Sequence, residues 1–140
     1  MTSDVQGQKE RRDWMNKKTN ILVIVSDQLT WRALSCYGNT YVNTENIDRI
    51  ADGGTCFDAA YTPCPLCQPA RASFWTGIYP HETKVLSNGR NFPVQPVPDT
   101  IPTIGEVFAK AGYETVHFGK CHDAGALRGF YCEPQESLPV

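Results

Sequence analysis

A cysteine, a proline and an arginine alternate in residues 67–71, which read Cys-Gln-Pro-Ala-Arg. Small residues follow, and together they predict a helix over about 68–76, with Pro69 just inside its start and Gly77 as its stop. A group just before a helix feels the free amides and the positive end of the helix dipole. Cys67 therefore stands where a reactive thiol, or a group that faces an anionic ligand, would be expected.

Two oxygen-bearing side chains, Asp27 and Gln28, follow the apolar run 21–25. The run is rich in β-branched residues and predicts a strand buried on both faces of a parallel sheet. Ligands of such sheets collect beyond the carboxyl ends of the strands, and hard cations prefer oxygen ligands. Asp27 is therefore a candidate metal ligand, although a lone aspartate at a strand end more often forms a turn or caps a helix.

A third polar group, Lys120 and His122, follows a second predicted strand over 113–118. An ammonium is a compact charge that suits an anionic oxygen, and an imidazole near its neutral pKa can carry a proton. Taken singly, both residues would more often be surface or turn residues. His117 lies inside the strand pattern and is expected to pack in the core. Asn88 is a candidate substrate contact from a loop, or simply a solvated loop residue.

The pair Cys64-x-x-Cys67 has another interpretation, because this spacing is also that of a redox pair or of half a zinc site. The other half of a four-ligand site is lacking, and only Cys121 with His122 could be invoked to supply it. An unmodified, reactive Cys67 is a further alternative.

These motifs, in this order, resemble the N-terminal segment of the type I, formylglycine-dependent sulfatases, a family of the alkaline phosphatase superfamily. The resemblance covers about residues 20–125. It rests on Asp27 after the first strand, on the Cys67-x-Pro-x-Arg71 core and on Gly119-Lys120-x-His122. The chain departs from the family pattern at Gln28, where a second aspartate is common, and at Cys121, where tryptophan is usual.

The resemblance implies a sulfatase mechanism, in which a maturation enzyme oxidises Cys67 to formylglycine and the hydrated aldehyde attacks sulfur. It implies that Cys67, Arg71, Lys120 and His122 are catalytic and that Lys120 binds substrate, beside the loop candidate Asn88. It further implies a divalent metal, Ca²⁺ first and Mg²⁺ or Mn²⁺ as alternatives, held by Asp27, Gln28 and the modified residue 67.

The implied substrate is a small sulfate ester or a sulfated sugar. Further metal and sulfate ligands of the family come from a segment past residue 140, so the isolated chain is expected to have little or no activity. Two other functions remain open at this point. One is a phosphoesterase or phosphonate monoester hydrolase of the same superfamily, and the other is a non-catalytic remnant that serves as an interaction module.

The expected fold class is α/β, an incomplete part of an alkaline-phosphatase-like layered mixed or parallel sheet with flanking helices. A helix is predicted after Asn43 or Thr44, with Ile47 and Ile50 inward and a glycine pair as its stop. A brief strand is predicted over 55–61, with Phe57 inward. The clearest helix spans 101–111, with Thr100 as its cap, Pro102 in its first turn and Gly112 after its end. It carries an apolar stripe at helical spacing, which comprises Ile101, Ile104, Val107, Phe108 and Ala111.

The domain organisation expected is a polar tail over 1–19 and a truncated N-terminal portion of a catalytic domain over 20–140. No helix or strand pattern follows Gly129. Unpaired strand edges in such a portion would favour self-association.

Composition excludes several classes of function. A chain of 140 residues with 41% hydrophobic residues can bury a core. Its net charge of −2 offers no basic footprint for nucleic acid and no polybasic patch for a membrane. The run 21–25 is too short for a signal peptide or a membrane span, which indicates a cytoplasmic location. Six cysteines without a signal peptide argue against a disulfide framework, and most are expected to be buried small hydrophobes.

Overall fold

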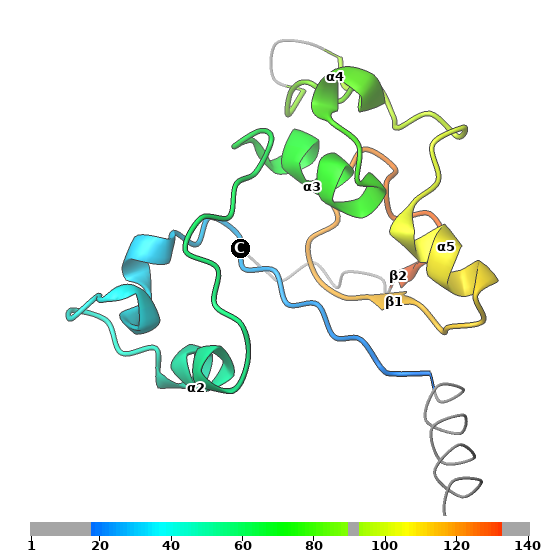
Figure 1. Cartoon of the computed structure of the whole chain (residues 1–140). Helices are drawn as coiled ribbons and strands as arrows, with labels where there is room; N and C mark the ends of the chain where they lie inside the picture. The colour runs from blue at the N-terminus through cyan, green and yellow to red at the C-terminus, as the bar shows by residue number, and fades with distance from the viewer. Residues whose placement is uncertain (1–17, 90–92, 133–140) are drawn as a thin grey trace, which may run out of the picture. The chain divides into compact units, whose positions relative to one another are not determined.

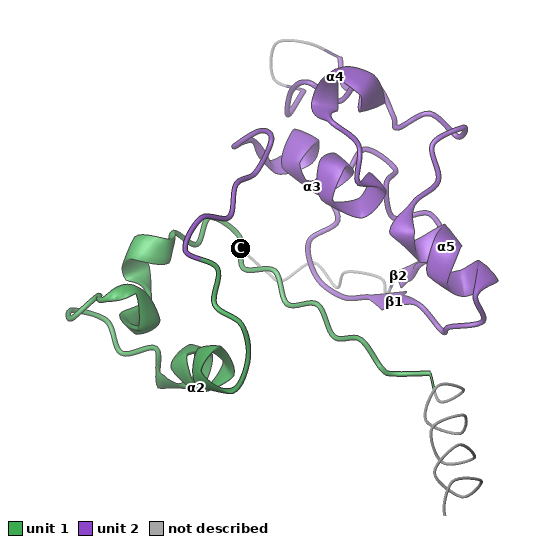
Figure 2. Cartoon of the chain, viewed as in Figure 1, with its two compact units in different colours: residues 1–57 green, residues 58–140 purple. Residues whose placement is uncertain are grey.

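The computed structural model describes residues 18–89 and 93–132, and it divides the chain into two compact units, residues 1–57 and 58–140 (Figures 1 and 2). Nearly all of the predicted polar tail lies outside the described residues. None of the helices within these two ranges combines the length and the hydrophobicity that a bilayer crossing requires.

The first unit contains two short 3-10 helices, η1 (Trp31–Ala33) and η2 (Ser35–Tyr37), and one α-helix, α2 (Glu45–Gly53). The helix predicted in this region is confirmed, because Thr44 occupies the N-cap position and Gly54 the C-cap position. The inward placement of its two isoleucines is wrong, since neither side chain is buried.

Polar side chains, rather than apolar burial, connect the elements of this unit. Thr44 Oγ1 accepts the Ser35 amide at 2.9 Å, and the Asp48 carboxylate accepts the Cys36 amide at 3.0 Å. Hydrogen bonding, first from the Ser35 side chain, holds the pKa of the Asp48 carboxyl below its usual range. Every buried core residue of the described chain lies in the other unit.

The strand predicted over 21–25 does not form within the described residues, and the strand predicted over 55–61 is also absent there. Leu22 is 84% exposed and Phe57 is 68% exposed, so neither segment is covered. A strand exists only when neighbouring strands satisfy its backbone, and within the described chain strand pairing occurs only between two other segments. The apolar run therefore retains the composition of a buried strand without the partners that would bury it.

The second unit builds its core around three helices, α3 (Cys67–Thr76), α4 (Pro80–Thr83) and α5 (Ile104–Lys110), with α3 packed against both others (Figure 1). The prediction for α3 is confirmed, and Gly77 ends it in the left-handed region at φ 71°. The core cluster comprises Ala72, Trp75, Val85, Val97, Ala126 and Leu127.

The start of α5 differs from the prediction. The helix begins three residues later than expected because Thr103, not Thr100, is the N-cap, which leaves Pro102 outside the helix. Thr103 and Glu106 form a capping box, in which each side chain bonds the backbone amide of the other. The predicted apolar stripe is only partly covered, since Val107 remains 53% exposed.

Two short strands, β1 (Val116–His117) and β2 (Tyr131–Cys132), pair in parallel, with Val116 opposite Tyr131 and His117 opposite Cys132. The strand predicted over 113–118 is thus confirmed in its last part. The expectation of no strand after Gly129 is wrong, because β2 is specified by pairing with a distant segment and not by its own two residues.

The turn that leads into β2 lies against the first turn of α5. A Cβ built on Gly105 would stand 2.6 Å from the carbonyl oxygen of Arg128 and would overlap the Phe130 ring. On the other side, Gly129 has φ 85° and abuts the backbone of Glu106. Only glycine allows this approach, because any side chain would separate the two backbones.

Replacing Gly105 by alanine should therefore destabilise the chain by about 1–3 kcal/mol, the usual cost of overpacking a closed contact. The matched control is Gly53→Ala at the end of α2, where an added Cβ meets nothing within 4 Å. Denaturant unfolding of both variants checks this. Equal stability of the two would contradict the close contact.

The capping box also predicts a pH dependence. The amide of Thr103 donates to the Glu106 carboxylate at 2.9 Å, and this bond, with the Thr103 hydroxyl and Arg128, lowers the pKa of Glu106. A lowered carboxyl pKa contributes stability above the unfolded-state value, which is about 4.3, and loses it as pH falls through the folded-state value. Glu106→Gln should therefore be less stable than wild type at pH 7, with the difference shrinking in acid.

Thermal unfolding of wild type and Glu106→Gln from neutral to acidic pH measures this difference. Glu114→Gln, at an exposed site, is the control and should follow the wild-type profile. A Glu106→Gln deficit that stayed constant down to the most acidic pH would contradict the role assigned to the ionised carboxylate.

Candidate functional site

Cys67 is the first residue of α3, and Leu66, with φ −115° and ψ 142°, is the N-cap. The cysteine is half-buried and is a free thiol. The amide of Gln68 donates to Asn88 Oδ1 at 3.0 Å, so the side chain of Asn88 satisfies one of the free amides of the first turn. Asn88 is thus half-buried beside Cys67, which corrects the solvated-loop interpretation and leaves its predicted role at substrate untested.

Arg71 lies one turn further along α3 and joins this helix to the loop after β1. Its guanidinium donates to the backbone carbonyl of Lys120 at 3.2 Å. The two residues are far apart in the sequence, yet the bond brings the arginine of the Cys-x-Pro-x-Arg core to the Gly-Lys-x-His segment. The side chain of Lys120 lies exposed at this junction.

The loop that carries Lys120 and His122 has an unusual backbone. Gly119 has φ 87°, and His122 and Ala124 adopt positive φ values of 38° and 54°. The buried Asp123 fixes the turn, because its carboxylate accepts the Leu127 amide at 2.6 Å. Non-glycine residues with positive φ cost free energy and persist only where surrounding contacts hold them, as they do here.

His122 is half-buried in this loop. Its Nδ1 atom is buried, and no hydrogen-bond partner for it occurs in the part of the chain that the structure describes. A buried, unpaired imidazole nitrogen is energetically unfavourable, so it is a position at which a ligand hydrogen bond would be stabilising.

The predicted metal ligands Asp27 and Gln28 lie in the first unit, and the other predicted site residues lie in the second. Gln28 has φ 61°, within a turn. Among residues 18–89 and 93–132, Asp27 belongs to no group of three or more histidine, cysteine or acidic side chains that could hold a metal ion.

His117 packs as predicted, edge-on against Trp75 at a ring distance of 5.9 Å and against Phe130 at 6.4 Å. Burial holds the pKa of its imidazole below the usual value, and the nearby Arg71 guanidinium acts in the same direction, while Asp123 opposes both. The histidine is therefore neutral at pH 7.

Two thiols near His117 had no sequence signal as a pair. Cys121 and Cys132 are eleven positions apart, and the pairing of β1 with β2 together with the turn after β1 brings them close. Burial raises the pKa of the Cys132 thiol, and the neighbouring Cys121 and Asp123 add to that shift. All six cysteines are free thiols and none is fully buried, so the expectation that most are buried small hydrophobes is wrong.

The second unit thus places a thiol at the start of a helix, an arginine one turn later and a lysine-histidine loop bonded to that arginine. The sequence profile of the Sulfatase family matches residues 19–129. The chain therefore belongs to the sulfatase family, of the alkaline phosphatase superfamily.

Individual proteins agree with this assignment. The chain is 47% identical over 114 residues to a Δ4,5-hexuronate-2-O-sulfatase of Bacteroides thetaiotaomicron, covering 81% of this chain and 24% of that protein. It matches the solved structure of a 2-O GAG sulfatase with a TM-score of 0.72 and 47% identity, over 76% of this chain and 23% of that one. The chain thus spans about a quarter of the length of these relatives.

A second solved structure shares the fold alone. It is a phosphonate monoester hydrolase of Agrobacterium radiobacter, matched with a TM-score of 0.59 and 24% identity over 72% of this chain and 22% of that one.

The bond between Asn88 and the first turn of α3 can be tested directly. Asn88→Ala removes the acceptor for the Gln68 amide and should cost about 1 kcal/mol, the net worth of one such hydrogen bond. If the first turn opens locally, its amides should exchange with solvent about fivefold faster. Asn88→Asp keeps an oxygen acceptor, adds a favourable charge at the helix start and should exchange no faster than wild type. Hydrogen-exchange measurements that found both variants equal to wild type would contradict the contact.

Proposed function

We propose that residues 20–140 form the N-terminal portion of a sulfatase catalytic domain and that residue 67, as formylglycine, cleaves a sulfate ester. The observation that carries the proposal is the bond from Arg71 to the Lys120 carbonyl, because it connects α3, the helix that begins at Cys67, to the loop of Lys120 and His122. Two motifs that were recognised separately in the sequence thereby meet in one unit of the fold.

Each residue has a role that follows from its place. Formylglycine supplies, as its hydrate, the hydroxyl that attacks sulfur. Cys67 precedes the free amides of α3, where an anionic group is stabilised. The Arg71 guanidinium and the Lys120 ammonium neutralise the charge that grows on the sulfate oxygens. His122 holds a proton at a ring nitrogen and exchanges it with the reacting group, while Asn88 stands beside the start of α3 and contacts the bound sulfate.

The metal of the proposed site is a hard divalent cation, with Ca²⁺ preferred and Mg²⁺ or Mn²⁺ as alternatives. Asp27 is proposed as a carboxylate ligand, Gln28 as a weaker carbonyl ligand and residue 67, once modified, as a third contact. Residues outside 1–140 are proposed to complete the coordination shell. The same additional residues would supply neighbouring strands for the apolar run 21–25, which is uncovered in the described chain.

The proposed substrate class is a sulfated sugar. Two of the proteins that this chain resembles are named for the 2-O-sulfate of a hexuronate and of GAG, and both match at 47% identity. The partner required for maturation is a formylglycine-generating enzyme, which acts on the segment that contains Cys67, Pro69 and Arg71.

Formylglycine formation tests the proposal. When the chain is co-expressed with a formylglycine-generating enzyme, the peptide that contains residue 67 should carry an aldehyde in place of the thiol. Mass spectrometry and hydrazide labelling detect that change. Cys67→Ala should abolish the label, and Arg71→Ala should reduce it strongly, because the maturation enzyme reads this residue.

The matched control is Cys64→Ser, which should label as well as wild type because this thiol lies outside the recognised core. A reference sulfatase segment expressed under the same conditions shows that the maturation enzyme is active. An unmodified Cys67 thiol, found beside a fully modified reference, would overturn the proposed function.

A further inference from the structure

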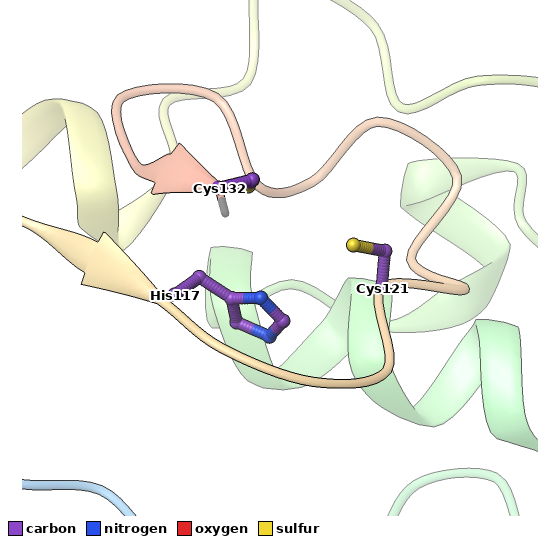
Figure 3. A group of neighbouring side chains, drawn as sticks. All are labelled: His117, Cys121 and Cys132. Carbon is purple, nitrogen blue, oxygen red and sulfur yellow. The ribbon is translucent and has the colours of Figure 1, made fainter. Parts of the chain in front are cut away.

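One group of side chains in the second unit lies outside the sulfatase motifs. His117, Cys121 and Cys132 each offer one ligand atom, and these three atoms all lie within 4.8 Å of one another. Figure 3 shows the Cys121 sulfur directed toward the strand segment that carries Cys132, with the imidazole of His117 beside the space between them. Of the groups of His, Cys, Asp and Glu in the described ranges, this is the one that meets such a spacing.

The backbone explains why the three side chains meet. His117 and Cys132 are register partners in the parallel pair of β1 and β2. Register partners direct their side chains to the same face of a sheet, so the imidazole and the thiol share one face. The chain then turns back at Gly119, which has φ 87°, and this turn returns Cys121 to that face.

The polar atoms of this group have few bonding partners. His117 Nδ1 is buried, and no hydrogen-bond partner for it exists in the described parts of the chain. The Cys121 thiol donates to the Gly119 carbonyl at 3.8 Å and the Cys132 thiol to the Phe130 carbonyl at 4.0 Å, and the two thiols also interact with each other. A buried imidazole nitrogen beside two weakly bonded sulfurs is a donor set that a cation would satisfy.

The donor types select the cation. One imidazole nitrogen and two sulfurs are soft to borderline ligands, which suit Zn²⁺ and exclude Ca²⁺ and Mg²⁺. Tetrahedral zinc with bonds of about 2.3 Å to sulfur and about 2.0 Å to nitrogen holds its donors roughly 3.5–3.8 Å apart. The present separations, which are within 4.8 Å, therefore need to close by at most about 1.3 Å.

We propose that His117, Cys121 and Cys132 bind one Zn²⁺ ion as three protein ligands, with the fourth position taken by water. Binding releases the two thiol protons and leaves both sulfurs as thiolates, with no change of oxidation state. The ion would fasten the loop of Cys121 to the β1–β2 pair. Because Lys120 and His122 flank Cys121, this site would hold the loop that presents both residues.

The proposal does not depend on the proposed sulfatase chemistry, since the zinc ligands are distinct from Cys67, Arg71, Lys120 and His122. It also differs from the zinc hypothesis suggested by the Cys64-x-x-Cys67 spacing. Neither of those cysteines belongs to the group, and the histidine involved is His117 rather than His122.

Cobalt titration of the whole 140-residue chain, reduced and freed of metal, tests the site. Co²⁺ takes the place of Zn²⁺ and gives a thiolate-to-metal charge-transfer absorption together with the visible bands of a tetrahedral ion. We expect both signals to saturate at one equivalent of Co²⁺ and to disappear when one equivalent of Zn²⁺ is added. A hard-cation site built on Asp27 would give no thiolate absorption, so the two metal sites are distinguished.

Variants identify the ligands. Cys121→Ser and Cys132→Ser should each abolish or strongly reduce the charge-transfer absorption, and His117→Ala should weaken Co²⁺ binding. Cys56→Ser and Cys64→Ser are matched controls, which remove a thiol elsewhere and should leave the titration unchanged. Circular dichroism of each variant separates loss of the site from loss of the fold. If a variant unfolds, cysteine alkylation of the wild-type protein tests the same ligands. Zn²⁺ should slow the modification of Cys121 and Cys132 but not that of Cys56.

Three results would overturn the proposal. The first is the absence of a thiolate band in folded, reduced wild type. The second is a band that survives Cys121→Ser and Cys132→Ser but disappears with Cys64→Ser. The third is a disulfide between Cys121 and Cys132 in protein freshly isolated from a reducing cytosol, because such a bond consumes both sulfur ligands.

Discussion

The close approach of the α5 backbone to the turn at residues 128–130 is the constraint on which the second unit depends. It requires glycine at positions 105 and 129, and the Arg128 guanidinium reinforces it through bonds to carbonyls, including Ile101 at 2.6 Å and Gly125 at 3.1 Å. The Thr103 hydroxyl adds a bond to the Arg128 carbonyl at 2.6 Å. Because these contacts fix where the chain returns after α5, they also place β2 beside β1 and determine the path of the loop between the strands.

The loop between β1 and β2 carries residues of both proposed sites, the sulfatase site and the zinc site. On one side it bonds Arg71 through the Lys120 carbonyl, and on the other it brings Cys121 to His117 and Cys132. Positive φ values at His122 and Ala124 show that its backbone is held away from ordinary conformations. Such a loop needs several anchors, and a zinc ion would add one to the arginine bond and to the buried Asp123.

The apolar run 21–25 shows what the composition of a segment does not guarantee. Its residues are those of a strand covered on both faces, yet they are exposed here, whereas the weakly patterned pair Tyr131–Cys132 forms a strand. A strand forms only when partner strands satisfy its backbone hydrogen bonds. The intrinsic propensity of its residues therefore determines a strand less than it determines a helix. The part of this chain that aligns with the matched sulfatases covers only about a quarter of their length.

The amino-acid sequence alone was enough to identify the sulfatase family, the span of α3 with its glycine stop, and the positions of α2 and of the β1 strand. These features depend on residues close together in the chain, whose propensities and caps act locally. Four other features emerged only from the folded chain: Thr103 caps α5, Asn88 bonds the start of α3, Arg71 reaches Lys120, and His117 meets two thiols. The α5 cap is a local signal that the prediction of Thr100 overlooked, because the capping box joins Thr103 to Glu106 three residues later. The other three features join segments far apart in sequence, so their formation depends on the packing of the whole unit, which no local pattern encodes.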